Sequence, residues 1–155
     1  MAQILVFSDS HGNLKEMIAA TRAHKPDYII HLGDYLEDAV TLQDGFPNIE
    51  VKMVPGNCDS ATDRNRTEEQ MISGRKVLFT HGHLYHVKSG LETLQAMGQE
   101  RCADLLLFGH THTAYYKQIG QMHMLNPGSI GKGERPSFAK VGISPREILC
   151  EHIYL

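Results

Sequence analysis

A chain of 155 residues, 41% of them hydrophobic and 21% charged, can bury a core of its own without disulfide bonds. The net charge of −3 and the dispersed Lys and Arg residues exclude a basic surface that would hold nucleic acid stably. No apolar run reaches the ~18 residues that a membrane span needs, so we expect no membrane partner.

The cysteines point to a reducing compartment. Cys58, Cys102 and Cys150 are scattered along the chain and form no C-x-x-C pair, so neither a disulfide framework nor a thiolate zinc site is indicated. The first apolar run is short and lacks the basic flank of a signal peptide. We expect a single domain over residues 1–155 in the cytoplasm, and a homo-oligomer stays open.

Strands and helices alternate in the first part of the chain. Residues 3–7 are expected to form a buried strand, residues 13–24 a helix capped by Asn13, and residues 27–32 a second strand. Strands joined through a helix lie parallel, which indicates an α/β fold. The further elements that we expect are a helix at 35–44, a strand at 49–54, a loop at 60–67, strands at 69–73 and 76–80, a helix at 88–101 and a strand at 104–108.

The helical period disappears after residue 114. Short apolar runs separated by Gly and Pro take its place, which is typical of strands joined by turns. They lie at 114–119, 122–125, 137–143 and 147–154. We expect them to form an antiparallel second sheet or the edge of a sheet.

Residues that can bind a metal follow five of the apolar runs directly. They are Asp9 and His11, Asp34, Asn57, His81, and His110 and His112. Side chains just beyond the carboxyl ends of parallel strands converge on one crevice, so these residues should meet. All of them offer oxygen or nitrogen and none is a thiolate. This donor set is typical of a site for Mn²⁺, Fe²⁺ or Zn²⁺ and not of a structural zinc cage.

The number of candidate ligands predicts the chemistry. Four or five ligands fill the coordination sphere of one ion, so seven candidate ligands imply two ions. Two ions ~3.5–4 Å apart, bridged by a carboxylate, can share a water, lower its pKa toward ~7 and bind the phosphoryl oxygen under attack. The pattern therefore predicts a hydrolase that uses a metal-bridging hydroxide as nucleophile.

The motifs resemble the signature of calcineurin-like metallophosphoesterases, in particular their small bacterial and archaeal phosphodiesterase-like branch. The ordered motifs are Asp9-x-His11, Gly33-Asp34, Gly56-Asn57, His81-Gly82 and Gly109-His110-x-His112. The resemblance covers the chain from residue 4 to about 129. It implies an α/β sandwich of two sheets flanked by helices, acting on a small phosphoester substrate.

The same resemblance implies how the ligands are shared. One ion would lie with Asp9, His11, Asp34 and His112. The other would lie with Asp34, Asn57, His81 and His110, so that Asp34 bridges the two ions. We expect Mn²⁺, with Fe²⁺, Zn²⁺ and Ni²⁺ as alternatives.

One position departs from the family pattern. Many members carry a histidine after the asparagine, where it contacts phosphate and can protonate the leaving group, whereas this chain has Cys58. A thiol with a pKa near ~8.5 replaces an imidazolium poorly. We therefore predict a preference for aryl or nucleoside esters, which need little protonation, unless His83 or His86 supplies the proton.

Three alternatives stay open at this point. Residues 81–86 match the H-x-H-x-D-H pattern of lactamase-fold hydrolases, except that Tyr85 replaces the aspartate and binds a metal poorly because its phenol is neutral at pH 7. The substrate could be a phosphomonoester instead of a diester. The chain could also be a protein-interaction scaffold, as the retromer subunit of this fold is, although it retains the full ligand set.

Other polar residues receive plainer interpretations. We expect Asp38 and Asp59 to be solvated or to cap helices, and the turn at 126–129 to be an ordinary turn, with support of the metal site as the alternative. Lys132 and Arg135 are expected in a solvated loop, with contact to substrate phosphate as the alternative. The histidines that we interpret as structural are His24, His31, His123 and His152.

Overall fold

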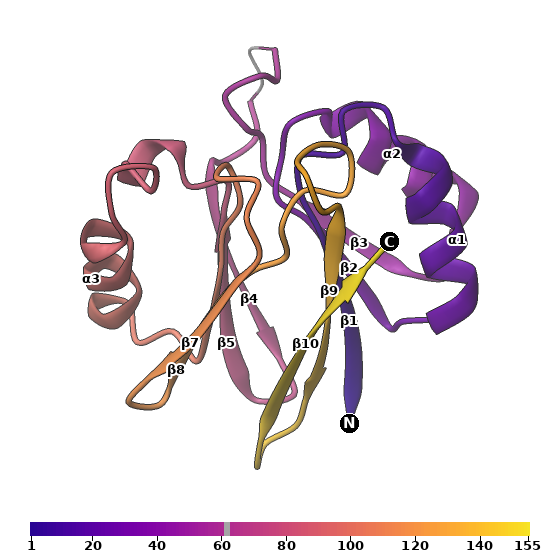
Figure 1. Ribbon diagram of the computed structural model, residues 1–155. Coiled ribbons are helices and arrows are strands. Elements are labelled where there is room, and N and C mark those ends of the chain that lie inside the picture. Colours follow the sequence, from indigo (N-terminus) through magenta and orange to yellow (C-terminus); the bar gives the residue numbers. More distant parts are fainter. Residues whose placement is uncertain (61–62) are drawn as a thin grey trace.

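Two five-stranded sheets pack face to face in the computed structural model, which describes residues 1–60 and 63–155 (Figure 1). The first sheet has the order β10 (Ile148–Tyr154), β9 (Ser137–Ile143), β1 (Ala2–Phe7), β2 (Tyr28–His31) and β3 (Glu50–Met53). The second has the order β4 (Thr67–Ile72), β5 (Arg75–Thr80), β6 (Leu105–Leu107), β8 (Met122–Asn126) and β7 (Tyr115–Ile119). The predicted two-sheet α/β sandwich is confirmed.

Helices cover the outer faces of the sandwich. They are α1 (Leu14–His24), α2 (Leu36–Gly45) and α3 (Glu92–Glu100), with a short 3-10 helix, η1 (His83–Tyr85). Helices α1 and α2 lie against the first sheet and α3 lies against the second (Figure 1). None of the helices in the described ranges is long and apolar enough to cross a membrane.

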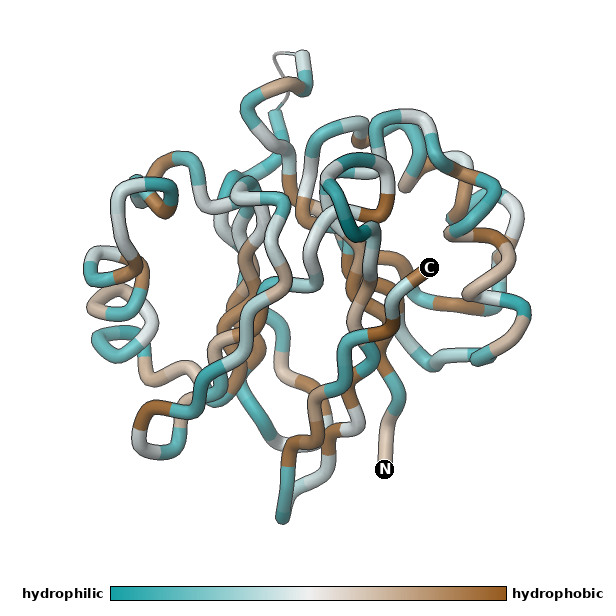
Figure 2. The backbone as a smooth tube through the Cα atoms, viewed as in Figure 1, coloured by the Kyte–Doolittle hydropathy of each residue, from teal (hydrophilic) through white to brown (hydrophobic). Residues whose placement is uncertain are grey.

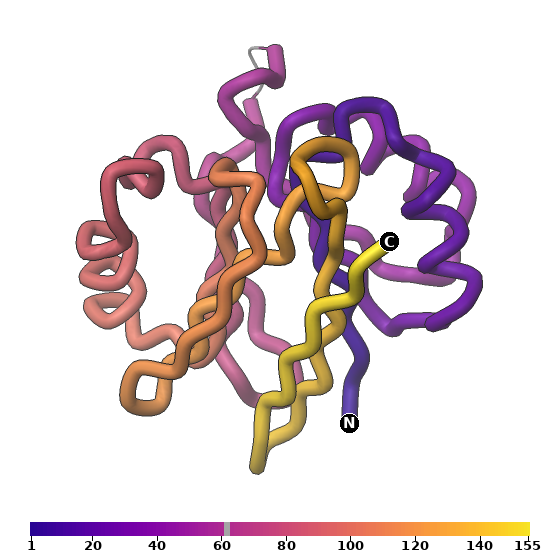
Figure 3. The backbone as a smooth tube through the Cα atoms, viewed as in Figure 1, coloured from indigo at the N-terminus to yellow at the C-terminus, as the bar shows by residue number. Residues whose placement is uncertain are grey.

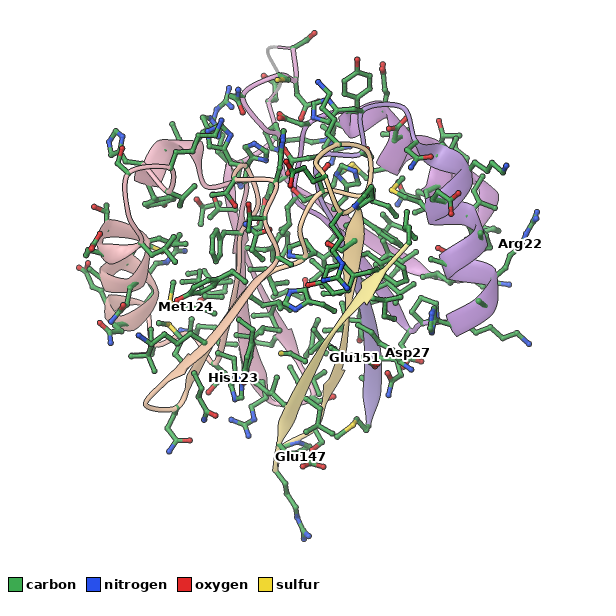
Figure 4. All side chains as sticks on the ribbon, in the orientation of Figure 1. Arg22, Asp27, His123, Met124, Glu147 and Glu151 are labelled. Atoms are coloured by element: carbon green, nitrogen blue, oxygen red, sulfur yellow. The ribbon has the colours of Figure 1, made fainter. Side chains whose placement is uncertain are left out.

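The central strands read as unbroken apolar runs because both of their faces are buried. On β1, Ile4 and Val6 point between the two sheets, whereas Leu5 and Phe7 pack against the helices. Figure 2 shows the resulting hydrophobic layers inside the molecule. On the other side, Met124 of β8 packs in the layer next to α3, where its label lies in Figure 4.

The strand directions bring five chain segments to one edge. Strands β1, β2 and β3 are parallel to one another, with Leu5 opposite Ile29, and β5, β6 and β8 are parallel in the second sheet. The loops that follow β1, β2, β3, β5 and β6 therefore gather at one edge, the top of the view in Figure 3. We call this edge the carboxyl edge and its opposite the amino edge.

The C-terminal strands differ from the prediction. They are divided between both sheets: β7 and β8 extend the second sheet, whereas β9 and β10 return to the first. Strand β8 is parallel to β6, and β9 is antiparallel to β1, with Ile4 opposite Val141. The chain crosses between the sheets after Asn126, and periodicity along the sequence carries no information about such a crossing.

Two element boundaries and one helix cap also differ from the prediction. The helix expected from residue 88 begins at Glu92, because Gly90 has a φ of 142° that no helix accommodates. The strand expected from residue 69 begins at Thr67; residues 61–62 of the expected loop lie outside the described residues. Asn13 occupies the N-cap position of α1, but its side chain donates to the carbonyl of Ile130 instead of capping.

Candidate metal centre

The seven predicted ligands meet at the carboxyl edge. His81 Nε2 lies 3.0 Å from Asn57 Oδ1, 3.1 Å from His110 Nδ1 and 3.5 Å from Asp34 Oδ2. His112 Nε2 lies 3.2 Å from Asp9 Oδ1. The loops that follow β1, β2 and β3 of one sheet thus touch those that follow β5 and β6 of the other.

Among residues 1–60 and 63–155, two groups of candidate ligand atoms are compact enough to hold a cation each. Group 1 consists of Asp9, His11, Asp34 and His112, and group 2 of Asp34, His81 and His110. Within each group the ligand atoms lie within 4.8 Å of one another. Asn57 adjoins group 2 through His81, and Asp34 belongs to both groups.

One of the candidate donor atoms lacks the protein partner that a purely structural role would give it. His11 Nε2 is buried and has no hydrogen-bond partner among the described residues. Burial, together with the neighbouring His81, lowers the pKa of His110 to about 4, so its imidazole is neutral and offers a lone pair at pH 7. Neutral imidazoles beside buried carboxylates are the donor set that a divalent cation requires.

The two carboxylates respond differently to their surroundings. Burial raises the pKa of Asp9, partly offset by the nearby His81 and by a hydrogen bond from Ser8 Oγ. Burial also acts on Asp34, but His81 and the backbone N–H of Cys58, 2.9 Å from Asp34 Oδ1, lower its pKa overall. The shared residue is thus the carboxylate that the fold itself keeps ionised.

Backbone strain is concentrated at the ligands. Five of the seven have positive φ angles although none is glycine: Asp9 (53°), His11 (44°), Asp34 (58°), His110 (70°) and His112 (61°). Such left-handed conformations disfavour side chains and persist only where the surroundings hold them. The close approach of the loops fixes them further, since a Cβ at Gly56 would lie 2.2 Å from Asp34 Oδ1.

Asp59 and Asp38 hold the loops of the candidate ligands and, as expected, belong to neither group of candidate ligands themselves. Asp59 binds backbone N–H groups as a capping residue does, whereas Asp38 is buried and not solvated. Asp59 accepts the backbone N–H groups of Asp34 at 2.9 Å, Gly56 at 2.7 Å and Leu36 at 2.8 Å. Asp38 is buried and its Oδ2 accepts from Ser10 Oγ and the N–H of Gly12. The position of Asp59 inside the Gly56-Asn57 turn was the available signal, because turn aspartates accept nearby backbone N–H groups.

The turn at 126–129 also supports the site. Ser129 Oγ donates to the carbonyl of Asp9 at 2.8 Å, and Asn126 Nδ2 donates to the carbonyl of Gly109 and to Thr111 Oγ1. The crossing between the two sheets therefore connects the first and last ligand motifs. Its supporting role, an alternative at the sequence level, is present in the structure.

The remaining histidines form contacts inside the fold. His31 is fully buried between Ser10 Oγ, at 3.0 Å, and the N–H of Gly33, and burial lowers its pKa to about 4. His123 pairs with Tyr116 at 2.7 Å, and the His152 ring lies against the carbonyl of Asn126 at 2.7 Å. His24 packs on Phe138 at a centroid distance of 5.8 Å.

His83 and His86 occupy different environments. The His83 ring lies 5.4 Å from that of His81 and 6.1 Å from that of His110, and its buried Nδ1 has no partner among the described residues. His86 is exposed. Tyr85, which the lactamase pattern would need near the metals, pairs with Thr67 instead. That alternative is overturned by the fold.

The family model of the calcineurin-like phosphoesterase superfamily domain matches residues 2–144. The chain therefore belongs to the calcineurin-like phosphoesterases. Its fold, two sheets flanked by helices with candidate metal ligands at one edge, is the one expected of a metallophosphoesterase.

Individual relatives of this chain carry names that agree with this family assignment. The probable metallophosphoesterase YsnB of Bacillus subtilis is 36% identical over 130 residues, which cover 82% of this chain and 74% of that protein. Phosphodiesterase YfcE of Escherichia coli K12 is 29% identical over 178 residues, which cover 96% and 90%.

Two solved structures share the fold. A predicted phosphoesterase from Streptococcus pneumoniae has a TM-score of 0.84 and 28% identity and covers 99% of this chain and 89% of that one. Zinc-bound Vps29 from Entamoeba histolytica has a TM-score of 0.77 at 22% identity, with 98% of each chain covered. The second likeness concerns the fold alone.

Proposed function

We propose that residues 1–155 form a single dinuclear phosphoesterase domain that hydrolyses phosphodiesters with water and without a covalent enzyme intermediate. The observation that carries this proposal is the sharing of one ionised carboxylate, Asp34, by two compact groups of ligand atoms. Two cations held in this way would supply a water of lowered pKa and charge stabilisation for the phosphoryl oxygens.

Each ligand has a definite part in this proposal. Asp9, His11 and His112 hold one ion, Asn57, His81 and His110 hold the other, and Asp34 bridges them. Asp59 and Asp38 keep the loops in the conformations that bring these atoms together. Oxygen and nitrogen donors fit Mn²⁺, which we propose as the working ion, ahead of Fe²⁺, Zn²⁺ and Ni²⁺.

Metal analysis combined with one assay tests the proposal. The chain is stripped with a chelator, reloaded with Mn²⁺, and measured for bound metal and for hydrolysis of bis(p-nitrophenyl) phosphate. We expect about two ions per chain, and a loss of at least about 100-fold in kcat/KM in Asp34→Asn. Asp44→Asn, on the exposed end of α2, is the matched control and should keep full activity.

The same measurement separates the enzyme from a scaffold of this fold. A chain that holds well under one ion and gains no activity with any of the four metals would favour the alternative function, a protein-interaction scaffold. Parallel assays with p-nitrophenyl phosphate decide between diester and monoester hydrolysis. The relative that is named a phosphodiesterase favours the diester.

His83 is the proposed source of the leaving-group proton, since its unpartnered buried Nδ1 lies beside the His81 and His110 rings. Burial lowers the pKa of His83, so we expect its contribution to be small for aryl leaving groups. Aryl diesters of graded leaving-group pKa test this role. His83→Gln should steepen the dependence of the rate on that pKa, and an unchanged slope would remove His83 from the mechanism.

The thiols support our proposal of a cytoplasmic location. Cys58, Cys102 and Cys150 are all free in the structure. Free thiols persist in a reducing environment, which fits the cytoplasm as the proposed location.

A further inference from the structure

A cavity of about 620 Å³ adjoins group 1 and is not explained by metal binding. His11 is the one member of either ligand group that lines it. Its lining also includes Tyr35, Leu36, Cys58 and Lys132. A volume of this size accommodates a ring-sized organic group next to the ions.

Tyr35 forms an aromatic wall of this cavity. Its ring lies 5.1 Å from the His11 ring, with an interplanar angle of 59°. The side chain is 39% exposed and belongs to none of the hydrophobic clusters of the described core. Folding therefore gives no reason for an aromatic residue at this position.

The backbone of Tyr35 is held in a costly conformation. Its φ is 72°, and that of the preceding residue, Asp34, is 58°, so a bulky side chain occupies the left-handed region. The N–H groups of Asp34 and Leu36, one on each side of Tyr35, both donate to the carboxylate of Asp59. The ring is therefore preorganised at the mouth of the site, and little ordering is needed when a ligand stacks on it.

A cation lies in the same lining. Lys132 is exposed, and its backbone N–H donates to Ser129 Oγ, which in turn donates to the carbonyl of Asp9. The lysine is thus tied to the loop that carries two ligands of group 1. Leu36 and Cys58 add apolar and weakly polar surface to the lining, which also contains the carboxylates of Glu37 and Asp59.

We propose that this cavity binds a flat aromatic ester group of the substrate, an aryl or a nucleobase ring, stacked on Tyr35, while Lys132 attracts the adjoining phosphate. Tyr35 is then the specificity-determining residue and Lys132 an anion-steering one. This inference rests on the proposed phosphoesterase function and names the substrate class. It also fits a site with Cys58 after Asn57, because a thiol protonates a leaving group poorly and aryl and nucleoside esters need little protonation.

Paired ligands that differ only in the ring test the proposal by binding. The Mn²⁺-loaded chain is titrated calorimetrically with phenylphosphonate and methylphosphonate, and separately with adenosine 5′-phosphate and ribose 5-phosphate. Stacking on an aromatic side chain predicts a preference of about tenfold or more for the ringed member of a pair. A preference in the first pair alone identifies an aryl group, and one in the second pair alone a nucleobase.

Variants of Tyr35 assign the preference to its ring. Tyr35→Ala should bring the ratio close to one, Tyr35→Phe should keep it, and Tyr35→Asn removes the ring with a residue that tolerates the left-handed backbone. Tyr116→Ala, a 42% exposed tyrosine on β7, is the matched control and should leave the ratio unchanged. Lys132→Gln should weaken the binding of both members of each pair equally. Unaltered affinities would overturn the proposed role of Lys132 in attracting the phosphate.

The outcomes separate this inference from the function on which it rests. No ring preference in either pair, or a preference that survives in Tyr35→Ala and Tyr35→Asn, overturns the aromatic site even if the chain hydrolyses bis(p-nitrophenyl) phosphate. A Tyr35-dependent preference in a chain without hydrolytic activity upholds the site and overturns the phosphoesterase.

Discussion

The two edges of the sandwich use the same residue types for different reasons. At the carboxyl edge a Cβ added to Gly56 would overlap Asp34, whereas at the amino edge a Cβ on Gly120 would meet nothing within 4 Å. Asp59 accepts three backbone N–H groups at the first edge, whereas Asp27, labelled in Figure 4, accepts one from Gln3 at the second. The close packing of the loops that carry the candidate ligands therefore distinguishes the carboxyl edge from the amino edge.

The glycines should give the largest contrast. Gly56→Ala displaces Asp34 and should lower kcat/KM for bis(p-nitrophenyl) phosphate at least about 100-fold, because sub-ångström placement of ligands controls the rate. Gly120→Ala adds a Cβ in the left-handed region, where φ is 59°, and should cost about 1 kcal/mol of stability with activity unchanged. Equal activity losses in the two variants would contradict the comparison.

The second largest contrast is expected between the stability effects of Asp59 and Asp27. Asp59→Ala leaves three N–H groups without their carboxylate and should lower the free energy of unfolding by about 2–4 kcal/mol, measured by urea denaturation of the metal-free chain. Asp27→Ala removes one exposed hydrogen bond and should cost less than about 1 kcal/mol. Similar decreases in the free energy of unfolding would mean that Asp59 stabilises the fold no more than Asp27 does.

The buried His31 should make the carboxyl edge sensitive to acid. Its pKa is about 4 in the fold against 6.5 for a free histidine, so between these pH values the unfolded chain binds a proton that the folded chain does not. Stability should therefore fall as the pH drops from about 6.5 to 4, by about 3 kcal/mol more in the wild type than in His31→Gln. Parallel stability curves of the two chains would refute this assignment.

The smallest expected effect concerns two exposed thiols. Burial of its sulfur and the nearby Asp34 raise the pKa of Cys58, which lies at the carboxyl edge. Cys102, the exposed reference away from the ligands, should react with iodoacetamide several-fold faster in the metal-free chain, because the thiolate is the nucleophile. Mass spectrometry of the labelled peptides measures both rates, and a faster Cys58 would show that the site does not suppress its thiolate.

The sequence predicted the inner strands and the ligands because both leave local signals. A strand buried on both faces, such as β1, is an unbroken apolar run, and a ligand follows where the run stops. The gathering of Asp9 with His81 and His112 follows from parallel strands, whatever their separation along the chain.

Long-range partners leave no such signal. That Asp59 and Asp38 bind backbone groups of other loops depends on how those loops stack, and the return of β9 to β1 depends on a crossing that no periodicity marks. The orientation of Tyr35 could not be predicted from the sequence either. Its left-handed backbone depends on the hydrogen bond that the next residue, Leu36, donates to Asp59.

Strand β1 lies between β2 and β9, so its second neighbour is synthesised more than 100 residues later, as the pairing of Ile4 with Val141 shows. During translation, the loop that contains Asp9 must wait for this neighbour and for Ser129 before it is anchored. A nascent chain whose β9 has not left the ribosome therefore lacks both the strand pairing of β1 and the hydrogen bond that hold the loop of the predicted ligand Asp9.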